Sequence, residues 1–589
     1  MKCKYQSAGK YVLFLMLFCM SLFLLFWDRN LDLKAVLGGI LLSVVYCSVC
    51  FYSVQRIMRT ENKTARYVLM FCVCWVVFLF FVSLLHPMIL WDTWQVYDMS
   101  KYVFSDFGYM DQIRQHIVFT HYEMAFPPVM PVGIALINLV FDMGVNASVY
   151  FNSIVLMLLV AAFSKLFRSE LYQLSGAIVL LFTMLGLTFT LVYLGGLTQI
   201  LGFYLLVLSI IMLMQSKLTL KDCAVLGVLC GLNLMNRFDA LAVAAVVLFI
   251  IPVVVYVNKK SIQKSVQSFA VYGFSLLVIC LPWIIYSIVH FSSIFITDNG
   301  RRLFNIVDTR PSTFFSASNP ALNIKDDFFG WANAFTGRVW TAIKACILAA
   351  LKSTLLPVII LAVIALLVVV IIKKMKIRNY YQLFKKKCNV RLIAVFLVIL
   401  GQEALFLLTG YGDQRYHIPI LVFIQIQFVW FLLDIGKNAK VTLPEKGILT
   451  RYKKIGITAV GLCAFVVLCF AFNPFNAIQK ILQGDNYSST LKLNSEEDAL
   501  RSYLVEGECT NLCIYRSENS FDFLKFSALS GITNMISPNN LSDENVEAFV
   551  NTFKINYLYS SNQEVVDCFS EKFTLEETEI EYLYRILIP

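Results

Sequence analysis

Apolar runs of about twenty residues recur along most of this chain and constrain its fold more than any other feature. Runs of this length match the hydrocarbon thickness of a bilayer, and lipid offers a peptide group no hydrogen-bond partner. Each run that crosses the bilayer must therefore be a helix. Only 15% of the 589 residues are charged, which is too few to cover soluble domains of this total length. The sequence predicts an all-α polytopic membrane bundle.

About thirteen runs qualify as transmembrane helices by length and hydropathy. They cover residues 11–27, 33–54, 67–90, 145–163, 174–194, 198–214, 223–236, 240–257, 269–289, 346–372, 392–409, 418–433 and 455–472. The basic N-terminus precedes the first run, and no small-residue cleavage site follows that run, so we expect a retained signal anchor.

Lysine and arginine predict which loops face the cytoplasm. With the N-terminus inside, this map makes every basic loop cytoplasmic, including segment 373–391 with its eight basic residues. An odd number of spans then places the C-terminus outside. Residues 473–589 include 18 acidic and 8 basic residues, a net charge of −10 against +21 for the rest. The basic excess follows membrane topology and does not indicate nucleic-acid binding.

This division predicts a multi-pass cell-membrane protein with two domains. The membrane domain covers residues 1–472, and an extracytoplasmic domain covers residues 473–589. Two outer loops of the membrane domain are long, at 91–144 and 290–344, and long loops on one face of a bundle often contain functional residues. The first loop includes Val129–Phe141, an apolar stretch too short to span, which we interpret as an interfacial helix.

The C-terminal domain has the pattern of a small α/β fold. Its expected elements are strands at 511–515, 555–559 and 582–588 and a helix at 546–553. Its three cysteines, Cys509, Cys513 and Cys568, allow one disulfide and leave one thiol over.

The first outer loop opens with a carboxylate at the membrane surface. Asp92 follows the third span directly, beside Trp91 and Trp94, which suit the interface. Sugar transfer to a hydroxyl needs a base, and a lipid-linked donor keeps its phosphate at headgroup depth. Asp92 is therefore a candidate catalytic base. The alternative is structural, because Asp92 with Gln95 forms a capping-box pattern for a helix. Asp98 is expected to be a solvated helix residue.

Other polar side chains of the same loop are candidates for positioning a substrate, namely Trp94, Gln95, His121 and Glu123. The alternative is a metal site at His116, His121 and Glu123. Hydrogen bonding to loop backbone or sugar is the favoured interpretation, and the sequence indicates no metal cofactor.

Basic side chains near the outer ends of spans are candidates for binding a lipid phosphate, namely Arg415, His417, Arg237 and Arg301. Arginine suits this role because its planar fork matches phosphate oxygens. The alternative for Arg415 is a snorkelling side chain at a helix end. The alternative for Arg237 is a structural pair with Asp239 in a tight turn.

These features together resemble the GT-C superfamily of integral-membrane glycosyltransferases. The resemblance covers the membrane architecture and three motifs: the loop-opening Asp92, Asn236-Arg237 after the short seventh span, and Arg415-Tyr-His-x-Pro419. It implies a polyprenyl-phosphate sugar donor and a glycan, wall polymer or lipid acceptor. It also implies catalysis by Asp92 and phosphate binding by Arg415.

The spacing Asp92-x-Trp94-x-x-Tyr97 is also similar to the first-loop motif of the oligosaccharyltransferase catalytic subunit. That subunit's WWDYG motif for acceptor sequons is absent from the C-terminal domain here, which argues against transfer to protein sequons. The protein mannosyltransferase-like branch often has Asp-Glu in this loop, whereas Thr93 follows Asp92 here. We expect an inverting glycosyltransferase at the outer face of a bacterial cytoplasmic membrane.

Two other functions stay open on the sequence. A flippase or transporter of lipid-linked oligosaccharides would need charged residues deep in its spans, where Gln402 and Glu403 are the candidates. A non-catalytic envelope assembly protein would bind a partner through its C-terminal domain and tolerate replacement of Asp92.

Reporter fusions test the topology that the loop charges predict. A reporter fused after Lys387 should be cytoplasmic, and one fused after Asn476 should be external. Paired fluorescent-protein and phosphatase fusions measure the side directly. A cytoplasmic C-terminal reporter would contradict the predicted map.

Overall fold

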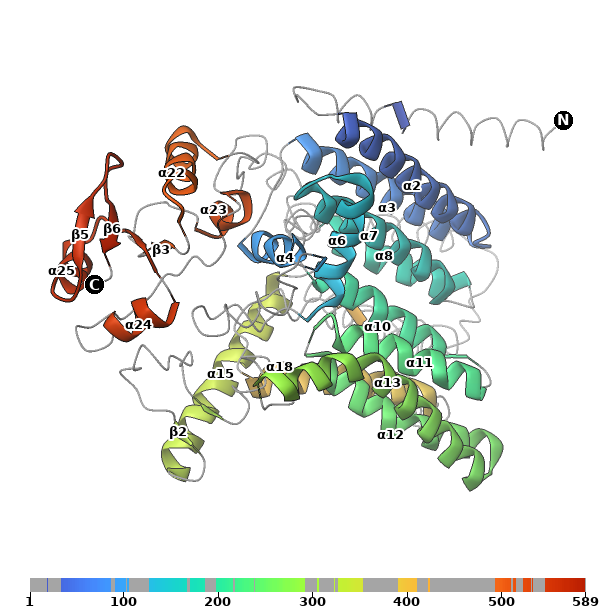
Figure 1. Cartoon of the computed structure of the whole chain (residues 1–589). Helices are drawn as coiled ribbons and strands as arrows, with labels where there is room; N and C mark the ends of the chain where they lie inside the picture. The colour runs from blue at the N-terminus through green and yellow to red at the C-terminus, as the bar shows by residue number, and fades with distance from the viewer. Residues whose placement is uncertain are drawn as a thin grey trace, which may run out of the picture.

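The computed structural model of the chain contains a helical bundle and a small α/β domain (Figure 1). It describes residues 18–19, 33–85, 91–101, 103–104, 127–166, 170–185, 198–215, 218–237, 239–291, 305–306, 322–323, 327–352, 390–409, 422–423, 493–509, 512–514, 523–530, 532, 546–553 and 555–587. The predicted span at 455–472 and nearly all of those at 11–27 and 418–433 lie outside the described residues. The predicted domain boundary at residue 472 does so too and stays a prediction.

The bundle consists of long, mostly apolar helices. They are α2 (Leu33–Met58), α3 (Lys63–Leu85), α7 (Asn146–Leu166), α8 (Glu170–Leu185), α10 (Gln199–Leu213), α11 (Leu220–Leu234), α12 (Ala240–Lys259), α13 (Ile262–Phe291), α15 (Phe328–Lys352) and α18 (Val390–Thr409). Among the described residues, five helices are long and apolar enough to cross a membrane, over Val36–Met58, Lys63–Leu84, Asn146–Leu166, Ala240–Lys259 and Ile262–Ile285. The sequence predicts about thirteen spans, and the described residues confirm five of them as helices that could cross a membrane.

Helix α7 lies inside the bundle, whereas α13 is largely exposed. α7 packs against α2, α3 and α10, and 78% of its apolar window is buried, compared with 17% for α13. The exposed side chains of α13 include the large apolar residues Phe274 and Leu277. A helix that is apolar on its exposed face as well as its packed face fits a lipid environment.

Helices α4 (Trp91–Lys101) and α6 (Val129–Phe141) lie at one end of the bundle (Figure 1). α6 has the bounds predicted for the interfacial helix, and it packs against α2, α4 and α7. Its outward residues Leu136, Leu139 and Val140 remain exposed. One buried and one exposed apolar face are consistent with a helix at a membrane interface.

Part of the segment predicted as the second long outer loop, 290–344, is helical, and its position relative to the membrane stays a prediction. Helix α15 already begins at Phe328, and short strands β1 (Asn305–Ile306) and β2 (Leu322–Asn323) pair antiparallel before it. Aromatic residues recur at helical spacing in α15, with the rings of Trp331 and Phe335 stacked 5.0 Å apart. Polar residues between them lower the mean hydropathy, so a search for apolar runs misses the first part of this helix.

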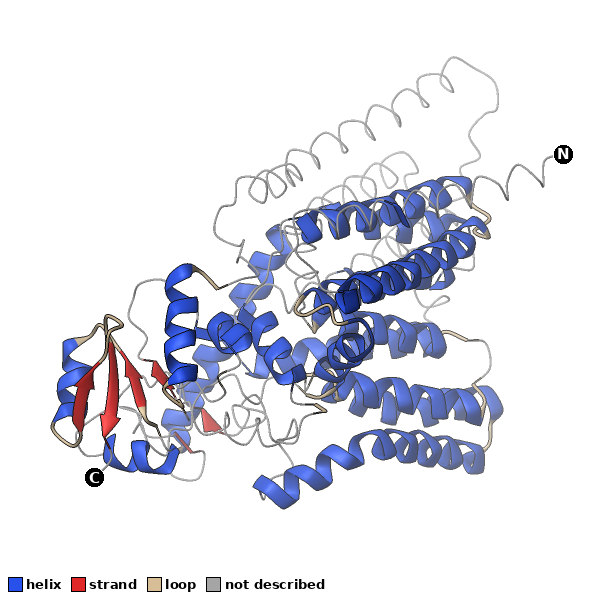
Figure 2. Cartoon of the chain, turned by 45° about the horizontal axis from the view of Figure 1, so that its top comes forward, coloured by secondary structure: helices blue, strands red, loops and turns tan. Residues whose placement is uncertain are grey.

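The C-terminal domain is a mixed sheet with helices on both faces (Figure 2). Its elements are α22 (Ser495–Glu506), β3 (Leu512–Ile514), α23 (Phe523–Ser530), α24 (Val546–Phe553), β4 (Tyr557–Tyr559), α25 (Gln563–Ser570), β5 (Thr574–Glu577) and β6 (Leu583–Leu587). The strand order is β3-β4-β6-β5, with β3 and β4 parallel and the other pairs antiparallel. One face packs on α24 and α25, and the other packs on α22 and α23.

The α/β character of this domain is confirmed, together with the predicted helix at 546–553 and the three predicted strands. Cys509 and Cys513 are free thiols, so no disulfide forms among the three cysteines of this domain. Cys513 and Cys568 pack on one face of the sheet and Cys509 on the other. Burial raises the pKa of the Cys509 thiol to about 12, so it stays protonated at neutral pH.

The contact between α2 and α6 depends on Gly38, and this gives a test of the fold. A Cβ atom at Gly38 would collide with the carbonyl oxygen of Phe141 at the end of α6. Gly38→Ala should therefore cost about 1–3 kcal/mol of stability, despite the higher helix propensity of alanine. The matched control is Gly337→Ala in α15, because nothing lies within 4 Å of a Cβ there. The measurement is the thermal midpoint of each purified variant, and equal midpoints would contradict this packing.

Candidate functional site

Asp92 is the second residue of α4. The residues before Trp91 and the side chain of Asp92 lie outside the described part of the structure, so the capping-box alternative stays open. The first turn of a helix favours a carboxylate because the backbone N–H groups there are unpaired. The side chains of Asp92 and Gln95 lie outside the described part of the structure, so their roles stay predictions.

Helix α4 is buried along most of its described length, and two of its buried polar groups have no hydrogen-bond partner in the described part of the chain. Trp94 and Thr93 are fully buried. Neither Nε1 of Trp94 nor Oγ1 of Thr93 has a hydrogen-bond partner among the described residues. Val96 and Met99 pack into the main apolar core of the bundle. A buried N–H group is costly to leave unpaired, so this indole is a ready donor for a polar ligand.

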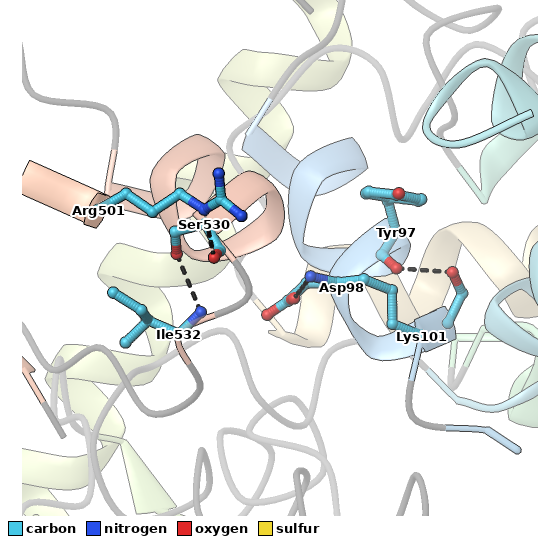
Figure 3. Close-up of polar contacts among 7 residues, drawn as sticks. Tyr97, Asp98, Lys101, Arg501, Ser530 and Ile532 are labelled. Atoms are coloured by element: carbon cyan, nitrogen blue, oxygen red, sulfur yellow. Dashed lines mark hydrogen bonds and ion pairs between the residues drawn. The ribbon is translucent and has the colours of Figure 1, made fainter. Parts of the chain in front are cut away.

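Asp98 is buried, which corrects its prediction as a solvated residue. Its side chain pairs with Lys101, with Oδ1 and Nζ 2.8 Å apart (Figure 3). The sequence misses this burial because α4 is covered by other elements on more than one side. Burial, followed by the carboxylates of Asp98 and Asp142, raises the pKa of Tyr97 to about 12. Tyr97 is therefore a neutral phenol at physiological pH.

Arg237 lies in the short turn between α11 and α12, and its guanidinium group is paired. Nε donates to Oδ1 of Asp239 at 2.8 Å, and Nη1 donates to Oγ1 of Thr198 at 3.0 Å. The Arg237 and Asp239 side chains are 14% and 11% exposed. Nδ2 of Asn236 donates to the carbonyl oxygen of Thr198 at 3.0 Å. These contacts form the structural pair that the sequence left as an alternative, and they join the start of α10 to this turn.

The polar corner around Arg237 includes residues that the sequence reasoning missed. Gly202 makes room for it, since a Cβ there would lie 3.2 Å from Cδ of Arg237. Oδ1 of Asn236 and Oε1 of Gln199 are buried and have no hydrogen-bond partner within the described part of the chain. Thr198 and Gln199 could have been found as a polar pair opening an otherwise apolar helix.

The Arg237 corner and α4 lie at the same end of the bundle. The backbone N–H of Val129, the first residue of α6, donates to the carbonyl oxygen of Met235 at 3.0 Å. Val129 also packs against the small apolar cluster of Leu234, Met235 and Cys280. Because α6 packs against α4 as well, it links the first-loop helices to the α11–α12 turn.

Helix α23 of the C-terminal domain packs against α4 at this end (Figure 3). The helix that contains Asp92 therefore contacts both domains.

Several predicted site residues lie outside the described residues, namely His121, Glu123, Arg301, Arg415 and His417. In the ranges that are described, no cluster of three His, Cys, Asp or Glu residues could hold a metal ion. The transporter candidates Gln402 and Glu403 lie on α18, which packs against α12 and α15, and Gln402 is buried.

Comparison with solved structures finds similar proteins, although no family model and no curated protein matches. The chain is similar to ArnT from Cupriavidus metallidurans bound to undecaprenyl phosphate, with 10% identity, a TM-score of 0.49, and coverage of 88% of this chain and 97% of that one. It is also similar to the oligosaccharyltransferase AglB from Archaeoglobus fulgidus in complex with an inhibitory peptide and a dolichol-phosphate, with 11% identity, a TM-score of 0.43, and coverage of 85% and 69%.

An oligosaccharyltransferase is thus among the similar structures. At these identities and TM-scores, the likeness assigns no activity, substrate or ligand to this chain.

A double-mutant cycle tests the structural role of Arg237. Asp239→Asn leaves the mostly buried guanidinium without its carboxylate, and breaking one partner of such a pair costs about 3–5 kcal/mol. Arg237→Met combined with Asp239→Asn removes both charges and should recover much of that loss. The thermal midpoints of the single and double variants measure the coupling. Strictly additive losses would show that the pair does not support the corner.

Proposed function

We propose that the protein is an inverting membrane glycosyltransferase that takes a sugar from a polyprenyl-phosphate carrier, with Asp92 as base. One observation carries the proposal. Asp92 lies in the short, mostly buried helix α4, at the same end of the bundle as the polar Arg237 corner. The Trp94 N–H of the same helix has no hydrogen-bond partner among the described residues. The GT-C-like motifs of the sequence support the same reading.

The reaction requires one base and one stabilised leaving group. The hydroxyl oxygen of the acceptor attacks the anomeric carbon of the donor sugar, and the carboxylate of Asp92 accepts the proton of that hydroxyl. The bond from that carbon to the phosphate oxygen breaks, and the polyprenyl phosphate leaves with the electron pair. A single displacement of this kind inverts the anomeric configuration.

The leaving phosphate needs cationic donors at headgroup depth. We assign this role first to Arg415, with His417 and Arg301 beside it, because arginine can bind two phosphate oxygens at once. Arg237 is a weaker candidate, since its described contacts hold Asp239 and Thr198. We assign Arg237 mainly a structural role, in which it holds the α11–α12 turn against the start of α10.

Hydrogen bonding of the donor sugar would orient it against Asp92. Nε1 of Trp94 is a candidate for donating a hydrogen bond to this sugar from the described part of the chain. Burial makes such a hydrogen bond stronger than it would be in water. Gln95, His121 and Glu123 are further positioning candidates from the same loop. We place the reaction on the extracytoplasmic side, with a glycan, wall polymer or lipid as acceptor, because the loop charges favour that orientation.

Asp92→Asn separates catalysis from structure. Asparagine keeps the size of the side chain but does not act as a carboxylate base, so transfer should fall by ~10²-fold or more. The stability loss should be small, about 0.3–1 kcal/mol for the lost charge in the first helical turn. The measurement is the rate of sugar transfer from a polyprenyl-phosphate donor, normalised to folded protein.

The matched control is Asp142→Asn, the same substitution at an exposed position in the same loop. Asp142 ends α6 with a left-handed backbone (φ 51°), a conformation that asparagine tolerates well. Its variant should keep the wild-type rate. Wild-type transfer in Asp92→Asn would remove Asp92 as base and favour the transporter or assembly functions.

A further inference from the structure

Helix α23 is fixed within the C-terminal domain by a buried ion pair. Nζ of Lys525 lies 2.9 Å from Oε2 of Glu497 on α22, and the two side chains are 9% and 6% exposed. The next residue, Phe526, is fully buried in the core between the sheet and these two helices. One face of α23 therefore packs against other elements of the C-terminal domain.

Glu497 makes a second contact within α22, and α22 also contacts the far end of α23. Glu497 also accepts a hydrogen bond from the backbone N–H of Asn494 at 2.8 Å, which completes the capping box of α22. At the far end of α23, Nε of Arg501 donates to the carbonyl oxygen of Ser530 at 3.0 Å (Figure 3). α22 thus contacts α23 at two points, one near each end of α23. These two contacts, Lys525–Glu497 and Arg501–Ser530, form what we call the α22–α23 clamp.

Helix α4 is packed from two directions. It packs against α6, and it packs against α23 of the C-terminal domain. Its sequence mixes polar and apolar residues without a single apolar face, and its described side chains from Thr93 to Ser100 are nearly all buried. A helix of this composition needs cover on more than one side to stay in place.

We propose that the α22–α23 clamp positions α4, so that the C-terminal domain sets the location of Asp92 in the membrane domain. Lys525 and Glu497 are the positioning residues. They act through α23 on α4 and not on a substrate, and the inference about catalysis rests on the proposed role of Asp92.

A buried ion pair suits this task better than an apolar contact of the same size. Apolar side chains slide over one another at little cost, whereas a buried charge pair tolerates only the arrangement that keeps both groups partnered. Truncating one partner should therefore loosen the orientation of α23 and, with it, the packing on α4.

The experiment uses the full-length protein in lipid nanodiscs and compares Lys525→Met with two controls. Lys525→Arg keeps the positive charge. Asp498→Asn removes a carboxylate from the solvent-exposed side of α22, where Asp498 lies 3.7 Å from Arg501 and the two side chains are 61% and 46% exposed. The readouts are hydrogen exchange of peptides from α4 and from strands β4 to β6, and the kcat and donor KM of sugar transfer.

We expect Lys525→Met to speed hydrogen exchange in α4 on the order of tenfold, while the β4–β6 peptides keep their protection. kcat should fall because Asp92 moves, and the donor KM should rise because Trp94, which we propose binds the donor sugar, lies on the same helix. Lys525→Arg should restore both values, and Asp498→Asn should match the wild type. Where Lys525→Met does not insert, Glu497→Gln replaces it with the same expectations.

Unchanged exchange in α4, or equal loss of protection in α4 and in the sheet, would overturn the positioning role. The exchange readout needs no turnover, so it stands even if the protein proves to have no transferase activity. If the wild type showed no sugar transfer but Lys525→Met still had faster hydrogen exchange in α4, the proposed function would be rejected. The positioning of α4 by the clamp would stand.

Discussion

The absence of hydrogen-bond partners in lipid is the constraint on which the rest of this structure depends. It forces the backbone of the membrane domain into helices, and it leaves turns and polar side chains stable only where water or other polar groups reach them. One end of the bundle collects such groups: α4, the start of α6, and the corner formed by Thr198, Asn236 and Arg237. In the described part of the chain, the polar groups that the proposed reaction would use lie at this end.

Helices of both domains pack together at that end. α6 links α4 to the α11–α12 turn on the membrane side, and α23 covers α4 from the C-terminal domain. A catalytic carboxylate on a free interfacial loop would sample many positions, and effective transfer needs a narrow range of geometry. A short helix packed between two domains would limit that range for the proposed base.

The sequence predicted elements whose signal is local and missed features that need tertiary context. The apolar run Val129–Phe141 and the amphipathic helix at 546–553 have clear periodicity, and both match the structure. α22 was missed because it is polar, although its Asn494 and Glu497 form a capping box. The burial of Asp98 depends on the packing of α6 and α23 on α4, and Lys525 pairs with Glu497, which lies 28 residues earlier. No local periodicity encodes either contact. Arg237 was identified, but its partner Thr198 lies 39 residues earlier.

Photo-crosslinking with a diazirine-bearing polyprenyl phosphate tests the central claim most directly. The full-length protein in nanodiscs would be irradiated with the probe, and labelled peptides mapped with and without an excess of unlabelled polyprenyl phosphate. Competed labelling is expected in α4, in α6 or in the turn at 235–239. Competed labelling confined to the opposite end of the bundle, at the turns 59–62 and 260–261, would contradict a carrier site beside Asp92.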